Sequence, residues 1–431
     1  MDVKRCVCKR SARLTRVCQR LRARMLRSPV WAVAVLALML CLPVHADVTN
    51  APGANLQISL ITYGPGATYW ERFGHDAIEV RDLGSGEAAN FNYGLFDFDE
   101  RGFLLNFARG RMRYLMGAAP SALDESLYVQ DKRSVTRQRL AFSPEQAAAL
   151  RDFLLWNLRP ENAAYPYDYY TDNCTTRVRD ALDAALGGVL RAQLTPLAGG
   201  MTFRQQTARM MSAQPWLMLV LDLGLGPYAD QPLNAWQESF LPGVLQTRLR
   251  GIHLTDKLGR VQPLVQAEQL VAPNLLDVPP AQPPDLRWPL ALAGLGCAGL
   301  LILAARVWSP GFVTLGTLYL LAAGLAGLLL LVLWTLTAHH AAWANANLLL
   351  FNPLAWLLLP ALWRTRRGLQ ASRASNGVIV LQLLAILVAV LLHLLPGTVQ
   401  QNQPWLLFAL PVWIALAWTL RQSPRAVARS I

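Results

Sequence analysis

The sequence predicts an α+β exported domain followed by an all-α polytopic membrane domain of about five helices. Of its 431 residues, 53% are hydrophobic and only 16% are charged, which is unusual for a single soluble protein. Residues 47–285 contain 26 of the 27 acidic residues, whereas residues 286–431 contain no Asp or Glu. The first of these regions has the composition of a water-soluble domain and the second that of a membrane domain.

The N-terminal 46 residues have the pattern of a secretory signal peptide. Residues 1–27 contain ten Lys or Arg and one Asp, and an apolar stretch over 28–46 ends in Val-His-Ala before Asp47. Because the basic stretch is long, an uncleaved N-terminal anchor is the alternative. Either interpretation places residue 47 onward outside the cytoplasm.

The remaining chain divides into a domain over 47–275, a Pro-rich linker over 276–287, a membrane region over 288–420 and a cytoplasmic tail over 421–431. Each apolar segment of the membrane region is near the roughly 20 residues that cross a bilayer. The segments lie at about 288–305, 311–336, 348–363, 377–395 and 404–420.

The positions of the arginines indicate how these segments are oriented across the membrane. If the first segment starts outside, the connections after the first, third and fifth contain Arg306, RTRRGLQASR and RQSPRAVARS. The two alternate connections, TAHHAAWANAN and PGTVQQNQP, contain no Lys or Arg. The positive-inside rule therefore places the 47–275 domain in the periplasm or outside, attached to a membrane by a multi-pass region. For a bacterial protein, we expect this membrane to be the inner (cytoplasmic) membrane and the domain to lie in the periplasm.

The net charge of +13 does not indicate a nucleic-acid partner. The basic residues flank apolar segments at the two ends of the chain, and the middle region is slightly acidic. We therefore expect no nucleic-acid binding.

Strand and helix signals alternate in the exported domain. Strands are expected at 56–64, 76–80, 89–94 and 134–142 from β-branched residues with turn signals between them. Ser143, Pro144 and Gln146 predict a helix from 143 to 158, and Asp172 or Asn173 caps a second helix from Cys174 to Leu186. The pattern is that of a small α+β domain.

Cys174 is the only cysteine between residue 47 and residue 285. A lone thiol in an oxidising compartment has no disulfide partner in its own domain. At a helix N-terminus the free N–H groups favour a thiolate, so we expect a lowered pKa and a reactive nucleophile. An inert buried cysteine is the alternative.

A general base and an orienting group complete this hypothesis. His75 lies between a glycine and a strand, while the domain's other histidine, His253, has no such setting. Asn92 on the following strand is the candidate for orienting the imidazole, with Asp76, Glu79 and Asp97 as alternatives. The domain has too few cysteines and histidines for a zinc site, and we expect no metal or other cofactor.

Four motifs carry a resemblance to a known family: ITYGPGATYWERFGHDAIEV, FNYGLFDF, NFARGRMRYLMG and YDYYTDNCTTRVRDAL. The order of His, polar residue and Cys resembles circularly permuted papain-like (NlpC/P60-like) folds. More closely, the motifs resemble the Lnb-type bacterial lipoprotein N-acyltransferases, which combine an exported thiol domain with C-terminal membrane helices. The similarity continues through YADQPLNAWQESFLP and AHHAAWANANLLLFNPLAW, and so covers most of residues 56–363.

The resemblance implies a membrane-bound acyltransferase. Cys174 would take an acyl chain from a phospholipid donor as a thioester, and the N-terminal amine of a diacylglyceryl lipoprotein would accept it. His75 would act as the base in both steps. An envelope thiol hydrolase of the same fold, acting on peptides, amides or lipids, and a non-enzymatic envelope sensor or scaffold are the alternatives.

The segment HHAAWANANLLLFNP over 339–353 places polar groups at or near the outer face of the bilayer, where they are costly and often functional. We therefore consider four residues as weak candidates for substrate contacts: His340, Asn345, Asn347 and Asn352. A loop with helix caps is the alternative. The apolar segment 215–227 is expected to be a core helix or a segment lying on the membrane surface. Arg109, Arg111 and Arg113 could neutralise phosphate, with a solvated basic strand as the alternative.

Overall fold

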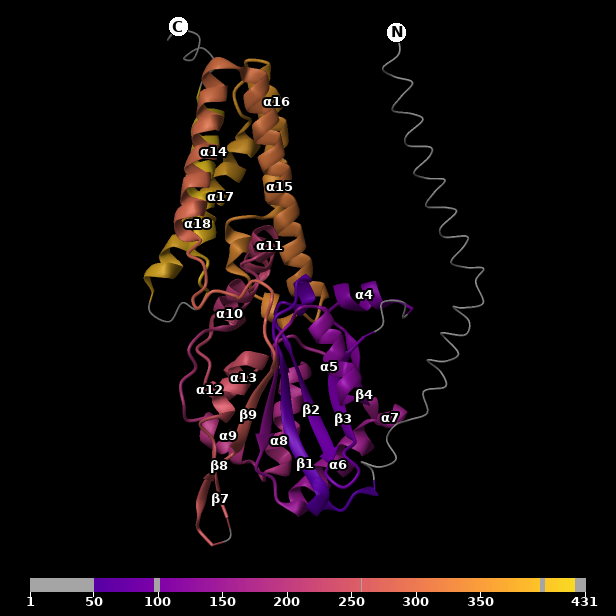
Figure 1. The fold of residues 1–431 in the computed structure, drawn as a ribbon. Coiled ribbons are helices and arrows are strands. Elements are labelled where there is room, and N and C mark those ends of the chain that lie inside the picture. The colour runs from indigo at the N-terminus through magenta and orange to yellow at the C-terminus, as the bar shows by residue number, and fades with distance from the viewer. Residues whose placement is uncertain (1–49, 97–100, 257, 396–399, 423–431) are drawn as a thin grey trace, which may run out of the picture.

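The computed structural model describes residues 50–96, 101–256, 258–395 and 400–422. A soluble α+β domain lies at one end and a bundle of long apolar helices at the other, as the sequence predicts (Figure 1). The expected signal segment 1–46, the candidate Asp97 and most of the tail over 421–431 lie outside the described residues.

An antiparallel seven-stranded sheet forms the centre of the soluble domain, in the order β6-β4-β3-β2-β1-β5-β9. The four expected strands are present as β1, β2, β3 and β5. Three strands of this sheet and a separate hairpin were not predicted. The bounds are β1 Leu56–Tyr63, β2 His75–Asp82, β3 Ala88–Leu95, β4 Arg113–Pro120, β5 Val135–Leu140, β6 Ala164–Pro166, β9 Val265–Ala272, and the hairpin strands β7 His253–Thr255 and β8 Val261–Pro263.

The two faces of the sheet are covered by different helices. Ile58 and Leu60 of β1 belong to the main core, together with side chains from α6 (Pro144–Asn157), α8 (Cys174–Ala185) and α13 (Pro242–Leu249). Ile61 and Tyr63 belong to a smaller cluster that packs against Tyr128 of α5 (Ser121–Gln130). Because successive strand residues point to opposite faces, α5 lies across the sheet from α8.

The two predicted helices begin where their caps indicate. The Ser143 hydroxyl accepts the N–H of Gln146 at 3.2 Å, and the Asn173 carbonyl oxygen Oδ1 accepts the N–H of Thr176 at 2.9 Å. Both caps are capping boxes, in which the third helical residue bonds back to the cap. Asn173 therefore caps α8, and Cys174 is its first residue.

Shorter elements connect this framework, mostly between α8 and the membrane region. Their bounds are η1 Gly53–Asn55, η2 Tyr69–Glu71, α4 Phe103–Ala108, α7 Pro160–Ala163, α9 Val189–Leu194, α10 Phe203–Met210, α11 Pro215–Gly224, η3 Pro227–Asp230 and α12 Ala235–Glu238.

Five segments of the described chain are long and apolar enough to cross a membrane, and four are continuous helices. These are α14 Arg287–Val307, α15 Ser309–Leu336, α17 Arg373–Leu394 and α18 Gln403–Arg421. The basic side chains Arg306, Arg364, Arg366, Arg367, Arg373 and Arg421 lie at or beside helix ends away from the soluble domain (Figure 1). This arrangement matches the orientation that the positive-inside rule gives.

The third span differs from the expected single helix over 348–363. It consists of three 3-10 turns, η4 His340–Ala342, η5 Ala346–Leu349 and η6 Pro353–Leu358, followed by the short helix α16 Leu359–Arg366. Proline removes a backbone donor and interrupts the regular ladder. Side chains of neighbouring helices take up freed carbonyls, since Gln382 donates to Leu349 O at 3.0 Å and Trp413 donates to Leu350 O at 2.9 Å.

Candidate active site

Cys174 lies at the first turn of α8, against the end of the central strands. Its side chain is half-buried and packs against the main core. The thiol Sγ lies 3.9 Å from the hydroxyl of Thr175.

Gly94 permits this close approach of α8 to the sheet. The pairing of β3 with β4 shifts register between Tyr93 and Leu95, and Gly94 in this irregularity has φ +89°. A Cβ atom at Gly94 would lie 3.2 Å from Cβ of Cys174. A glycine is therefore required both by the backbone angle and by the contact with the candidate nucleophile.

His75 is the first residue of β2 and faces α5. Its ring stacks with Tyr63 at 5.9 Å and Tyr128 at 6.0 Å between centroids, and these two tyrosines stack on each other at 3.6 Å. Nε2 of His75 lies 3.0 Å from Oδ1 of Asn92. Because an amide oxygen can only accept, Nε2 carries the proton and Nδ1 is left as the acceptor.

The thiol lies against the backbone of β2 at the end of the sheet. The backbone N–H of Asp76 donates a hydrogen bond to Sγ, so the peptide group that joins His75 to Asp76 lies against the thiol. In the described part of the chain, no hydrogen bond joins Sγ directly to the His75 ring. The fold thus brings Cys174 against the peptide group that follows His75, while the His75 ring lies on the α5 side of the sheet with Asn92.

Asp76 is a component of this site that the sequence named only as an alternative orienting group. Its side chain is fully buried on the α8 face of the sheet, where the Thr62 hydroxyl donates to Oδ1 at 2.8 Å. Burial raises the pKa of Asp76 to about 7, while the hydroxyls of Thr62 and Thr175 and the charge of His75 oppose the shift. Asp76 therefore adjoins the thiol, whereas Asn92 contacts the imidazole.

The expected lowering of the Cys174 pKa is wrong. Burial and the charge of Asp76 raise the pKa of the thiol to about 11, although hydrogen bonds from Thr175 and from the Asp76 N–H act in the opposite direction. Burial also lowers the pKa of His75, against the hydrogen bond to Asn92. Both shifts favour the neutral forms, so a base has to take the thiol proton as the sulfur attacks.

A polar network that the sequence did not indicate holds the aromatic stack behind His75. The Tyr63 hydroxyl donates to Asp124 at 2.6 Å, and the Asn90 amide donates to the same carboxylate at 3.0 Å. On the far side, the Arg133 guanidinium lies 4.6 Å from the centre of the Tyr128 ring. These groups come from β1, β3, α5 and the α5–β5 connection, and no short motif contains them.

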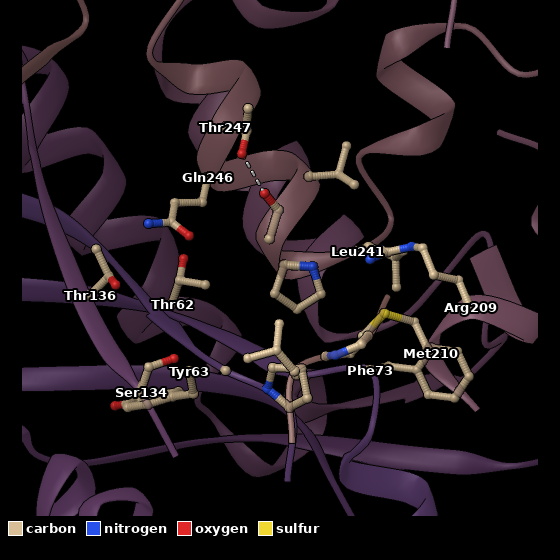
Figure 2. A pocket seen from close by; sticks show the side chains of 18 of the residues that line it. Thr62, Tyr63, Phe73, Ser134, Thr136, Arg209, Met210, Leu241, Gln246 and Thr247 are labelled. Carbon is tan, nitrogen blue, oxygen red and sulfur yellow. Dashed lines mark hydrogen bonds between the residues drawn. The ribbon is translucent and has the colours of Figure 1, made fainter. Parts of the chain in front are cut away.

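A cavity of about 500 Å³ adjoins this site on the α13 side (Figure 2). Figure 2 shows strand residues such as Thr62 and Thr136 on one wall, with Leu241 and Gln246 opposite them. Cys174 and His75 do not line it, but Thr62 does, and the Thr62 hydroxyl bonds Asp76. The cavity is therefore a neighbour of the site and does not contain the thiol.

Two of the weak substrate-contact candidates have structural partners. Asn345 donates to the carbonyls of Leu223, Gly224 and Leu225 at 2.9–3.1 Å, and Asn347 donates to Leu223 O at 2.9 Å. Both side chains are buried, and they bind the C-terminal end of α11. For these two residues, the contacts favour the alternative interpretation, in which the segment is a loop that caps a helix.

The other two candidates lie apart from the thiol. The exposed His340 packs edge-on against Trp343 at 4.5 Å. Asn352 donates to Gln382 at 2.7 Å within the helix bundle.

His339, which the sequence did not single out, reaches the soluble domain. Its Nε2 lies 3.0 Å from Phe107 O, and its Nδ1 lies 3.4 Å from the hydroxyl of Tyr169. Tyr169 belongs to the loop that leads into Cys174. This loop therefore connects the membrane domain directly to the segment that carries the thiol.

Two models of one protein family match this chain. One, described as the Lnb N-terminal periplasmic domain, matches residues 48–209, and the other, described as the Lnb transmembrane domain, matches residues 290–425. No curated protein and no solved structure matches the chain, so the permuted papain-like assignment stays a prediction. Since the two matches together cover more than half of the chain, it belongs to the Lnb family of membrane proteins with a periplasmic domain.

Proposed function

We propose that this protein is a thiol acyltransferase that moves an acyl chain from a phospholipid to the N-terminal amine of a lipoprotein, with Cys174 as nucleophile. The observation that carries the proposal is the half-buried Cys174 at the start of α8, which accepts a hydrogen bond from the N–H that follows His75, while the His75 ring lies 3.0 Å from Asn92. Membership of the Lnb family and the attached membrane domain supply the lipid context.

In the first half-reaction, Sγ of Cys174 attacks the ester carbonyl of the phospholipid while Nδ1 of His75 takes the thiol proton. The resulting tetrahedral intermediate carries an oxyanion, and N–H groups at the start of α8 are suited to stabilise it. Its collapse breaks the ester C–O bond, and the imidazolium returns the proton to the leaving alkoxide. The products are a lysophospholipid and an acyl thioester on Cys174.

In the second half-reaction, the uncharged amine of the lipoprotein attacks the thioester carbonyl. His75 takes a proton from the nitrogen as the amide bond forms, and the C–S bond breaks. The imidazolium then returns this proton to the sulfur. Because the resting thiol has a raised pKa, a neutral Cys174 beside a neutral His75 is restored at the end of the cycle.

The arrangement favours transfer over hydrolysis because both substrates are lipid-anchored. The loop containing His339 contacts Tyr169, five residues before Cys174, so the membrane domain and the thiol segment share a contact. A soluble hydrolase of peptides has no need of such a connection.

The proposal is tested in cells depleted of their own lipoprotein N-acylation. Wild-type protein and Cys174→Ala are expressed, and lipoprotein N-termini are examined by mass spectrometry. We expect N-acylated lipoproteins with wild type and free amines with the alanine variant. Free amines in both strains refute the transferase, whereas acylation in both strains refutes Cys174 as nucleophile.

A further inference from the structure

Short helix α4 exposes apolar side chains next to the active-site end of the sheet. Leu104 is 77% exposed, Leu105 53% and Phe107 47%, while only Phe103 of this helix is buried. A cluster of large apolar side chains is unfavourable in water unless an apolar partner, such as a protein surface or a lipid layer, covers it. The neighbouring elements indicate which partner covers this one.

Helix α4 is held at the soluble-domain end of membrane helix α15. The N–H of Ala338, two residues after α15, donates to Arg109 O at 2.8 Å, and His339 bonds Phe107 O. With 28 residues, α15 is about 42 Å long, roughly 12 Å more than the hydrocarbon thickness of a bilayer. This length allows the end of α15 and the attached α4, which lie between the bundle and the sheet in Figure 1, to extend beyond the hydrocarbon layer.

A second apolar segment lies at the same end of the soluble domain. Trp216 is 69% exposed and Val220 57% exposed on α11, whose C-terminal carbonyls bind Asn345 of the membrane domain. Trp405 of α18 also donates to Asp222 of α11 at 2.8 Å. The apolar surface of the membrane domain thus continues onto the soluble domain through α11, in addition to α4.

Basic side chains follow α4 directly. Arg109, Arg111 and Arg113 are exposed, and among the described residues none of the three forms an ion pair. Apolar side chains next to exposed arginines are typical of segments that lie in the interface of a membrane with anionic lipids. The partner indicated by this combination is the lipid leaflet itself.

We propose that α4, with Trp216 and Val220 of α11, lies in the headgroup region of the leaflet facing the soluble domain and admits phospholipid to the Cys174 site. Phe107 contacts the loop of His339, which contacts Tyr169 beside the thiol segment, so the surface is continuous with the site. The role in admitting lipid rests on the proposed acyl transfer, whereas the depth of α4 in the leaflet does not.

Depth is measured on the full-length protein in nanodiscs of phosphatidylethanolamine and phosphatidylglycerol. A fluorophore is attached to Leu104→Cys or, as control, to Leu258→Cys, in a chain whose other cysteines are serine. Leu258 is 78% exposed in the β7–β8 hairpin at the opposite end of the domain. We expect nitroxide-labelled lipid to quench the fluorophore at 104 at least threefold more than that at 258. Equal quenching overturns the proposal.

Entry of phospholipid into the site is measured as the rate at which the Cys174 thioester forms. Leu104→Asp with Leu105→Asp is expected to lower the rate from bilayer phospholipid at least tenfold and leave the rate from a water-soluble short-chain ester unchanged. Leu258→Asp with Val261→Asp is the matched control, expected to change neither rate. An equal loss with both substrates, or no loss, contradicts a lipid-entry role. If wild type forms no thioester with either ester, the acyl-transfer proposal fails, while quenching still decides the depth of α4.

Discussion

The pKa values of His75 and Cys174 are both shifted in the direction that favours the neutral side chain. These shifts determine how the thiol can be activated for attack. Burial lowers the pKa of the imidazole and raises that of the thiol to about 11. A preformed thiolate–imidazolium pair needs the opposite shifts. The residues therefore support attack assisted by a general base, with the proton moving as the new bond forms.

Alkylation of Cys174 by iodoacetamide tests this protonation state. Only the thiolate reacts with iodoacetamide. A thiol pKa of about 11 therefore predicts slow modification at pH 7 and a modification rate that still increases with pH at values well above 8.5. Asp76→Asn removes one cause of the shift and is expected to move the rise to lower pH. The measurement is the rate of mass increase on Cys174 against pH, and a plateau already reached at pH 7 contradicts the neutral thiol.

Substitution of Asn92 tests the orientation of His75 through its pH profile. Asn92→Asp keeps an acceptor 3.0 Å from Nε2 but adds a charge that favours the imidazolium. An adjacent opposite charge shifts a pKa by about 1–3 units. Since the base must be neutral, the acidic limb of thioester formation should move to higher pH. Asn92→Ala should lower the rate without that upward shift, and identical profiles for both variants exclude the orienting role.

At the scale of elements, the junction of β3 with α8 depends on one glycine. Gly94 has φ +89° and would place a Cβ 3.2 Å from Cys174, whereas Gly86 has φ +81° and nothing within 4 Å. Both alanine variants should lose about 1–2 kcal/mol of stability from the left-handed backbone. Only Gly94→Ala should also slow thioester formation, because it displaces the nucleophile.

Thermal unfolding and the thioester rate separate these two effects. Equal stability losses with a rate loss confined to Gly94→Ala are the expected result. If Gly86→Ala slows the reaction as much, the backbone strain acts through the whole sheet and the contact with Cys174 has no special role.

At the scale of the whole molecule, Asn345 joins the membrane domain to α11. Its amide donates to three carbonyls at the end of α11, and Asn345→Ala leaves these buried groups without that donor. Asn347 still donates to Leu223 O and Gln400 to Leu225 O, so Gly224 O is the carbonyl that loses its donor. An unpaired buried polar group costs about 1–3 kcal/mol, so the end of α11 should open more easily. Hydrogen exchange over residues 221–226 should accelerate. Asn352→Ala, which loses a bond to Gln382 within the bundle, is the control and should leave that exchange unchanged.

The same variant distinguishes the two roles considered for Asn345. A substrate contact predicts slower acyl transfer with unchanged exchange at 221–226. A structural contact predicts the change in exchange whether or not transfer slows.

The sequence by itself determined the features that depend on neighbouring residues. Apolar length gave five membrane segments, arginine placement gave their orientation, and local caps gave the starts of α6 and α8. The lone Cys174 and the glycine-preceded His75 also stand out in the chain, and their catalytic roles stay predictions. Such signals are readable because caps and hydrophobic length act over a few residues or within one segment.

Only the tertiary structure decided the features that depend on distant partners. The strand β9 pairs with β5 across more than a hundred residues, and its side chains are largely exposed, so no burial pattern marked it. The broken third span depends on Gln382 and Trp413, and the raised Cys174 pKa depends on burial and on Asp76. In each case desolvation and long-range hydrogen bonds outweighed the local preference, including the helix N-terminus that alone would have lowered the thiol pKa.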